Sequence, residues 1–166
     1  LPFHPSKAYA IREFRTNAAD MLRQVEKEAE GFFDKPIKLP LLTDKVKNGQ
    51  VYVDQGVVAG CSGGTFENVM RMTEILRGHS IGDGAFSLSV YPASQPQYLA
   101  LLEHHAAMDL MRSGAVLRSA FCGPCFGAGE VPAHGGFSIR HTTRNFPNRE
   151  GSKPSSGQIA YVALMD

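Results

Sequence analysis

Two kinds of hydrophobic pattern alternate along the chain, and the first is helical. Near the N-terminus, apolar residues recur at a spacing of about 3.6 and predict a helix that begins at Asn17 or Asp20. The residues on its apolar face are Ala18, Met21, Leu22, Val25 and Ala29. Residues 1–14 mix prolines with aromatic residues and are expected to be extended, and residues 34–49 are predicted to form a loop with one short strand.

After residue 50, short apolar runs typical of buried strands alternate with helical patterns. The predicted strands are residues 55–60, 85–93, 115–120, 135–143 and 158–165. The predicted helices are residues 65–78, with Thr65 as N-cap and Gly78 at the end, and residues 95–112. Strands that alternate with helices favour an α/β fold, a three-layer α/β/α arrangement with a mostly parallel sheet and helices on both faces.

The change of pattern near residue 50 divides the chain into two expected segments. Residues 1–49 are expected to form a lead-in segment and helix that join from a preceding region, and residues 50–166 an α/β domain. The sequence opens at Leu1 without an initiator methionine and stops at Asp166, directly after a strand-like run. We therefore expect a fragment of a larger chain, with other domains of the same polypeptide as its partners.

Composition excludes several classes of function. With 17 Lys and Arg against 16 Asp and Glu, the formal charge of +1 gives no basic patch for nucleic acid. No apolar run approaches the roughly 20 residues of a membrane span, and no signal-peptide pattern opens the sequence, so we expect neither a membrane partner nor secretion. The three cysteines, an odd number, also argue against a secreted disulfide scaffold and favour a cytoplasmic protein.

Three unusual loops follow predicted strands. They are "AGCSGGTF" at residues 59–66, "AFCGPCFGAG" at residues 120–129 and "HTTRNFPNREGS" at residues 141–152. In open α/β sheets the ligand site lies outside the carboxyl ends of the strands, so these loops are the expected site. All three cysteines of the chain lie in the first two loops.

Cys122-Gly-Pro-Cys125 on its own suggests a thioredoxin-type dithiol. Such chemistry needs a helix after the second cysteine, whose N-terminal N–H groups stabilise a thiolate. Here "FGAGEVPAHGG" follows Cys125, and its glycines and proline oppose a helix of useful length. We therefore do not expect dithiol redox chemistry.

A serine hydrolase is a second interpretation. Gly60-Cys61-Ser62-Gly63-Gly64 fits the G-x-S-x-G nucleophile elbow, with Ser62 as nucleophile between a predicted strand and helix. Asp109 and either His134 or His141 would complete a triad. The sequence shows no oxyanion-hole motif before Ser62, and this interpretation leaves the cysteines unexplained.

A soft-metal site uses all three cysteines. Thiolates from Cys61, Cys122 and Cys125 favour zinc or an iron–sulfur cluster, and the flanking glycines let the backbone approach closely. Three protein ligands leave one metal position open, which is typical of a catalytic site. A non-catalytic zinc-binding or metal-free interaction domain remains an alternative.

The same three loops carry a resemblance to a known family. CGPC-F-G, followed about twenty residues later by R-N-F-P-N-R, together with "GVVAGCSGGTFENVMRMTEILRG", resembles the iron–sulfur domain of the aconitase family of hydro-lyases over roughly residues 50–166. The resemblance implies a [4Fe-4S] cluster bound by Cys61, Cys122 and Cys125. It also implies that Arg144 and Arg149 bind the carboxylates of a small carboxylic-acid substrate, which suits guanidinium chemistry. The implied reaction is the hydration or dehydration of hydroxy-carboxylic acids.

The sequence departs from the family pattern at two positions. Gly63 replaces an asparagine common two residues after the first cluster cysteine, and Thr143 replaces an asparagine common before the first arginine. These departures favour a divergent hydratase-like member over aconitase itself. The family's proton-abstracting serine and acid–base residues match no segment of this chain, so we expect the fragment alone to be inactive. We also expect part of the cluster's enclosure to be absent, which favours loss of the cluster from the fragment.

Overall fold

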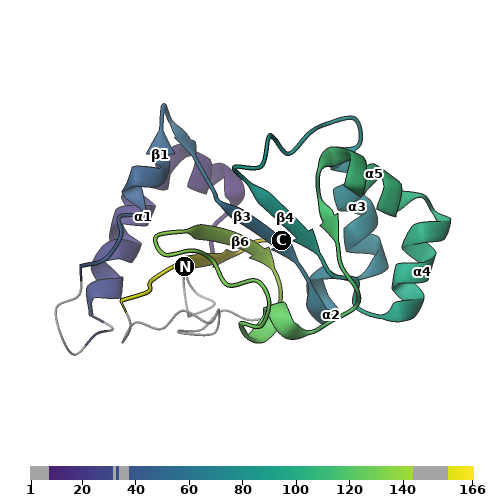
Figure 1. Cartoon of the computed structure of the whole chain (residues 1–166). Helices are drawn as coiled ribbons and strands as arrows, with labels where there is room; N and C mark the ends of the chain where they lie inside the picture. Colours follow the sequence, from purple (N-terminus) through teal and green to yellow (C-terminus); the bar gives the residue numbers. More distant parts are fainter. Residues whose placement is uncertain (1–7, 32, 34–37, 144–156) are drawn as a thin grey trace.

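The computed structural model describes residues 8–31, 33, 38–143 and 157–166, and its centre is a parallel β-sheet. Five strands lie in the order β5-β4-β3-β6-β7, and every neighbouring pair is parallel (Figure 1). Their bounds are β3 Gln55–Val58, β4 Ser87–Val90, β5 Val116–Leu117, β6 Phe137–His141 and β7 Tyr161–Leu164. The predicted α/β class and parallel sheet are confirmed.

Helical segments precede the first strand and connect β3, β4, β5 and β6. Their bounds are α1 Ile11–Glu30, α2 Gly60–Gly63, α3 Phe66–Leu76, α4 Gln95–Glu103 and α5 Ala106–Ser113, with the 3₁₀ helices η2 Thr43–Lys45 and η3 Gly123–Phe126. The N-cap predicted for α3 is confirmed, because the Asn68 backbone N–H donates to Thr65 Oγ1 at 3.4 Å. None of the helices in the described ranges has the length and apolar character needed to cross a membrane.

The long helices pack on one face of the sheet, which we call the helix face. The register pairs Val58 with Val90 and Phe137 with Tyr161, and alternation along each strand places these side chains on that face. Val90 belongs to a buried cluster with residues of α3, α4 and α5. Phe137 and Tyr161 belong to a second cluster that contains Leu22 of α1. Residues from both predicted segments thus share one cluster, and the domain boundary at residue 50 stays a prediction.

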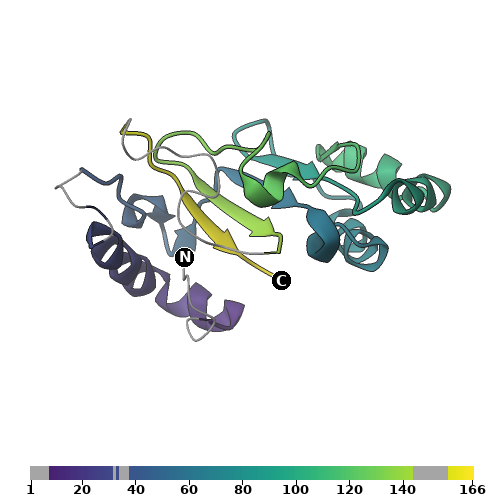
Figure 2. The same ribbon diagram turned by 90° about the horizontal axis from the view of Figure 1, so that it is seen from below.

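The opposite face, which we call the loop face, is covered by the segment between β5 and β6. Ser138 and Arg140 of β6 point to this face, as does Tyr91 just after β4, because they alternate with helix-face residues. The described covering layer is a loop that contains η3, not a second layer of α-helices. Figure 2 shows η3 (green) above the sheet and α1 (purple) below it.

Helix α1 begins earlier than the sequence pattern predicted. The pattern placed its start at Asn17 or Asp20 and the preceding residues in an extended lead-in, whereas α1 begins at Ile11. Asn17 has non-helical angles (φ −118°, ψ 19°), which mark a kink inside the helix. The first turn is retained because Phe14 packs against the cluster around Leu22.

The predicted helix 95–112 is two helices. His105 adopts a left-handed conformation (φ 60°) between α4 and α5 and interrupts the backbone ladder. The break redirects α5 so that Ala106, Ala107 and Leu110 become buried against the core. Packing thus overrides a continuous helical pattern that the sequence alone favoured.

The region predicted as a loop with one strand, residues 34–49, contains part of a hairpin among its described residues. β1 Val46–Lys47 pairs antiparallel with β2 Gln50–Val51. The turn between them is Asn48-Gly49, and both residues have positive φ (52° and 73°), as a tight hairpin turn requires.

Truncation of Leu110 tests the packing of α5. Leu110 is fully buried, whereas the neighbouring Met111 is 66% exposed. Leu110→Ala should lower the free energy of unfolding by about 2–5 kcal/mol through the lost contacts and the cavity, and Met111→Ala by about 0.5 kcal/mol or less. Urea unfolding followed by circular dichroism measures both; equal losses in the two variants would contradict this packing.

Candidate metal centre

Cys61 lies where β3 ends. The chain turns through Ala59 into the short helix α2, and Gly60 adopts a positive φ of 76° at this turn. The Ala59 backbone N–H donates to the His141 carbonyl at 3.0 Å, which ties the turn to the end of β6. The Cys61 side chain is therefore presented, exposed, at the carboxyl edge of the sheet.

Cys122 and Cys125 lie in a single tight turn. Cys122 is the residue immediately before η3, and the Cys125 backbone N–H donates to the Cys122 carbonyl at 3.1 Å. Cys125 is buried and Cys122 is exposed. η3 has four residues and ends at Gly127 with φ 85°, so no long helix follows Cys125, as the sequence predicted. All three cysteines lie in described residues, and none forms a disulfide.

Thr143 joins the two cysteine loops. Its Oγ1 lies 3.8 Å from Cys61 Sγ and 3.9 Å from Cys125 Sγ. The distance between the two sulfurs therefore cannot exceed the sum of these two distances, although 63 positions lie between the two cysteines in the sequence. The structure brings Cys61, Cys125 and Thr143 into one small cluster at the strand ends.

Two glycines allow this close approach. A β-carbon added to Gly60 would lie 2.5 Å from Cys125 Sγ, so only glycine lets this sulfur rest against the turn. A β-carbon added to Gly63 would overlap the backbone carbonyl of His141. The absence of asparagine at position 63 therefore has a physical reason, because α2 packs directly on the end of β6 and leaves no room for a side chain.

Two buried hydroxyls beside these residues have no hydrogen-bond partner within the described part of the chain. They are Ser62 Oγ, next to Cys61, and Thr142 Oγ1, next to Thr143. Buried hydroxyl groups normally have partners, so these two are exceptions within the described part of the chain. Within the described residues, no three His, Cys, Asp or Glu side chains are arranged to hold a single metal ion.

A polar network under the cysteine turn was not predicted. On the loop face, the Arg140 guanidinium donates to Ser138 Oγ, Gln55 Oε1 and the Pro124 carbonyl, each at 3.1 Å, and to the Glu130 carbonyl. Arg140 is 1% exposed. The sequence contains little signal for this network, because Ser138 and Arg140 alternate with the apolar Phe137 and Ile139, a pattern that predicts a solvent-exposed polar face.

Glu130 completes the network. Its carboxylate accepts hydrogen bonds from Tyr91 Oη at 2.7 Å and from Gln55 Nε2 at 3.2 Å, and lies 4.0 Å from Arg118 Nε. Burial, together with the hydrogen bond to Glu130 and its negative charge, raises the pKa of Tyr91 to about 12. The network links β3, β4, β6 and the cysteine segment.

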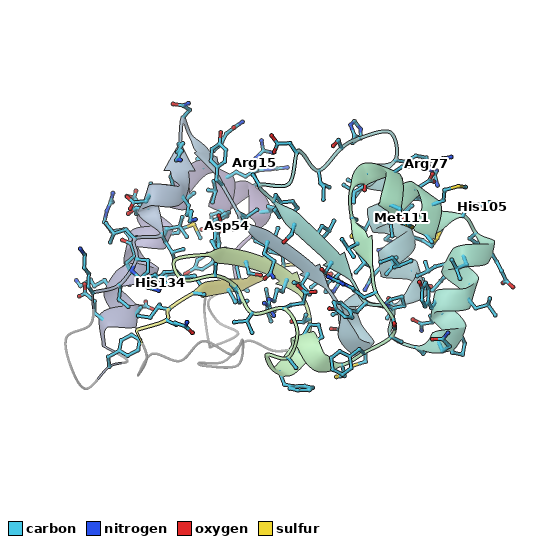
Figure 3. The ribbon with its side chains drawn as sticks, viewed as in Figure 1. Arg15, Asp54, Arg77, His105, Met111 and His134 are labelled. Carbon is cyan, nitrogen blue, oxygen red and sulfur yellow. The ribbon has the colours of Figure 1, made fainter. Side chains whose placement is uncertain are left out.

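The described residues do not assemble the serine-hydrolase triad. Ser62 Oγ has no partner in the described ranges, and Asp109 binds Arg77 at 2.8 Å. His134 Nδ1 accepts from the Ile159 backbone N–H at 3.2 Å. Figure 3 shows Arg77 and His134 at opposite ends of the molecule, so Asp109 cannot reach His134. His141 Nε2 lies 3.5 Å from Asp166.

Two predicted substrate-binding residues, Arg144 and Arg149, lie outside the described residues. Arg144 directly follows Thr143, the residue that joins the cysteine loops, and Arg149 lies five positions after Arg144. Their assignment stays a prediction.

The chain is similar to one protein family and to several curated proteins. The model of the aconitase family (aconitate hydratase) matches residues 1–165. The large subunit of 3-isopropylmalate dehydratase from Clostridium beijerinckii is 28% identical, over 95% of this chain and 39% of its own length. The large subunit of 2,3-dimethylmalate dehydratase from Eubacterium barkeri is 34% identical, over 66% of this chain and 26% of its own length.

A third relative is the large subunit of 3-isopropylmalate dehydratase from Methanoregula boonei. It is 33% identical, over 61% of this chain and 24% of its own length. The chain therefore spans between about a quarter and two fifths of the length of these relatives.

Substitution of Gly60 tests the contact with Cys125. Gly60→Ala adds backbone strain and a collision with the sulfur, whereas Gly78→Ala adds strain alone, because Gly78 has φ 77° and open space around its α-carbon. We expect Gly60→Ala to cost more stability than Gly78→Ala and to expose Cys125 to thiol reagents. Urea unfolding measures the loss of stability, and the rate of labelling by a disulfide reagent measures the exposure of Cys125. Equal stability losses and equal labelling rates in the two variants would contradict the close contact between Gly60 and Cys125 Sγ.

Tyr91, which belongs to this polar network, should make the stability of the fold depend on pH. Burial first, and then Glu130, raises the pKa of Tyr91 from 10.0 to about 12, so the folded state favours the neutral phenol. This stabilisation is complete below about pH 10 and is lost as the pH rises towards 12. Tyr161, whose pKa burial and Glu26 also raise to about 12, contributes in the same direction.

Unfolding free energies measured between pH 9 and 11.5 should therefore fall, and Tyr91→Phe should make the fall shallower. Tyr52→Phe, at a side chain that is 51% exposed, controls for the loss of a hydroxyl. An unchanged slope in Tyr91→Phe would show that this phenol is not held neutral by its surroundings.

Proposed function

This chain belongs to the aconitase family, and on that basis we propose that it is the cluster-binding part of a hydro-lyase that dehydrates and rehydrates hydroxy-carboxylic acids. One observation carries the proposal. Thiols from two loops, Cys61 and Cys125, lie around one hydroxyl at the carboxyl edge of a parallel sheet. That edge is where α/β proteins bind their ligands.

The residues present fit a [4Fe-4S] cluster. Cys61, Cys122 and Cys125 would hold it, since three thiols are the soft ligands that such clusters require. Cys61 Sγ and Cys125 Sγ lie 3.8 Å and 3.9 Å from one hydroxyl, Thr143 Oγ1, so thiols from two separate loops stand close together.

Bound there, the cluster would supply an iron with an open coordination position, a Lewis acid towards a hydroxyl leaving group. The chain's own contribution is enclosure and orientation. Gly60 and Gly63 keep the turn after β3 pressed on the cysteine segment and on β6, so side chains do not fill the space around the sulfurs. Thr143 Oγ1 offers a hydroxyl within reach of two of the sulfurs, and donors to cysteine sulfur tune such sites.

We propose a hydroxy-dicarboxylic acid as the substrate class. The relatives compared above are named for 3-isopropylmalate and 2,3-dimethylmalate, both substituted malates. Arg144 and Arg149 match the family's carboxylate-binding arginines, and a guanidinium can bind a carboxylate through two parallel hydrogen bonds. The relatives are named as large subunits, so we propose that a further subunit or domain supplies acid–base groups.

Loss of one cysteine tests the cluster directly. After anaerobic incubation with iron and sulfide, the natural full-length protein should bind iron and sulfide and show the absorption and paramagnetic-resonance spectra of a [4Fe-4S] cluster. Cys122→Ser should lose most of the bound cluster, because a hydroxyl is a poor ligand for this soft metal site. Ser62→Ala, which removes a neighbouring hydroxyl and no ligand, should keep it.

Three results would contradict the proposal. One is tight binding of zinc in place of iron and sulfide. Another is equal cluster content in the protein and in Cys122→Ser. The third is covalent labelling of Ser62 by a fluorophosphonate, since that would restore the serine-hydrolase interpretation.

A further inference from the structure

Apolar packing holds the middle of the segment that carries Cys122 and Cys125 but not its flanks. Pro124 and Cys125 are buried, whereas Phe121 is 52% exposed, Phe126 59% and Val131 49%. Among the described contacts, a backbone hydrogen bond such as that from Ala128 N–H to the Gly123 carbonyl at 2.9 Å closes a local turn. Polar contacts with the sheet are therefore needed to fix the whole segment.

Arg140 meets that requirement from inside the sheet. One guanidinium nitrogen, Nη1, donates to the Pro124 carbonyl at 3.1 Å, between the two cysteines. The other, Nη2, donates to the Glu130 carbonyl at the far end of the segment. A single planar group thus binds the cysteine segment at two places six residues apart, and a rigid fork holds both at a fixed separation.

The guanidinium is itself fixed. Its Nε donates to Ser138 Oγ, and its Nη2 donates to Gln55 Oε1, each at 3.1 Å. Ser138 Oγ donates in turn to Gln55 Oε1 at 2.8 Å. Gln55 Nε2 then donates to the Glu130 carboxylate, so the amide links a buried cation to a buried anion. A buried charge is costly unless it is bound in this way, so the arrangement resists displacement.

We propose that Arg140 is the positioning residue that fixes the Cys122–Cys125 turn for its metal cluster, and that its positive charge lies in the surroundings of that cluster. The inference rests on the proposed function and goes beyond it, because Arg140 is neither one of the proposed cluster ligands nor one of the proposed substrate-binding arginines. Partners that orient the ligands of a metal commonly change its affinity by about 10–100-fold when they are removed.

Three variants of the natural full-length protein test the proposal. Arg140→Met removes the charge and the fork, and Arg140→Lys keeps the charge but not the planar fork. Arg77→Met is the control, because Arg77 pairs with Asp109 of α5, at the other end of the molecule from His134 (Figure 3). The readouts are hydrogen exchange of the backbone amides of residues 123–130 without metal, the rate of cluster loss, and the reduction potential of the reconstituted cluster.

Exchange of residues 123–130 should accelerate by roughly 10–100-fold in Arg140→Met, because charged hydrogen bonds to two carbonyls are lost. Exchange of α3 and α5 should stay unchanged. The cluster should be lost about tenfold or more faster in Arg140→Met and less so in Arg140→Lys. Loss of the positive charge should make the reduction potential more negative in Arg140→Met, whereas Arg140→Lys should keep nearly the original value.

The outcomes separate the two proposals. Wild-type exchange of residues 123–130 and wild-type cluster retention in folded Arg140→Met and Arg140→Lys would overturn the positioning role and leave the cluster proposal standing. The opposite outcome is also possible to observe: hydrogen exchange of residues 123–130 is faster in Arg140→Met, but the unmodified protein binds no cluster. That result would support the role of Arg140 in fixing the turn and would overturn the cluster proposal.

If both variants misfold, hydrogen exchange of the unmodified protein still tests the proposal. If Arg140 fixes the segment, the Cys125 and Ala128 amides should exchange as slowly as those of β6. Exchange of these two amides within the shortest labelling time would overturn the proposal.

Discussion

The buried guanidinium of Arg140 is the constraint on which the site depends. A permanent charge at 1% exposure must find partners for its donors, and it finds them on β3, on β6 and on two carbonyls of the cysteine segment. A loop with exposed aromatic residues is thereby held against a sheet face. The loop face of the sheet is consequently polar where it supports the site, while the helix face carries the main apolar core.

The parallel register brings the remaining parts of the site together. Val58 pairs with His141, so the chain leaves β3 and β6 at the same level of the sheet edge. Cys61 follows one strand and Thr143 the other, and they meet for that reason. Gly60 and Gly63 make the contact close enough, because neither position has space for a side chain. The two departures from the family pattern, Gly63 and Thr143, therefore belong to one local arrangement in which α2 packs against β6.

Membership of the aconitase family and the geometry of the site address different parts of the function. The family match is the basis of the proposed hydro-lyase activity, whereas the geometry concerns how one segment would hold its cofactor. The chain spans between about a quarter and two fifths of its curated relatives, so the reacting groups of a complete enzyme need not all lie in these 166 residues. What the described residues provide is a thiol-lined edge, fixed by a buried cation and enclosed by glycines.

The sequence by itself determined the α/β class, the five strands, the Thr65 cap and the loops that carry the cysteines, because these follow from local periodicity and turn chemistry. It did not predict the start of α1, where packing of Phe14 retains an extra turn, or the break at His105, where burial of Leu110 redirects the helix. It also missed the network of Arg140, Gln55, Glu130 and Tyr91, whose members lie far apart in the chain. Tertiary structure alone decided these features, because long-range packing and the pairing of buried charge depend on which distant residues the fold brings together.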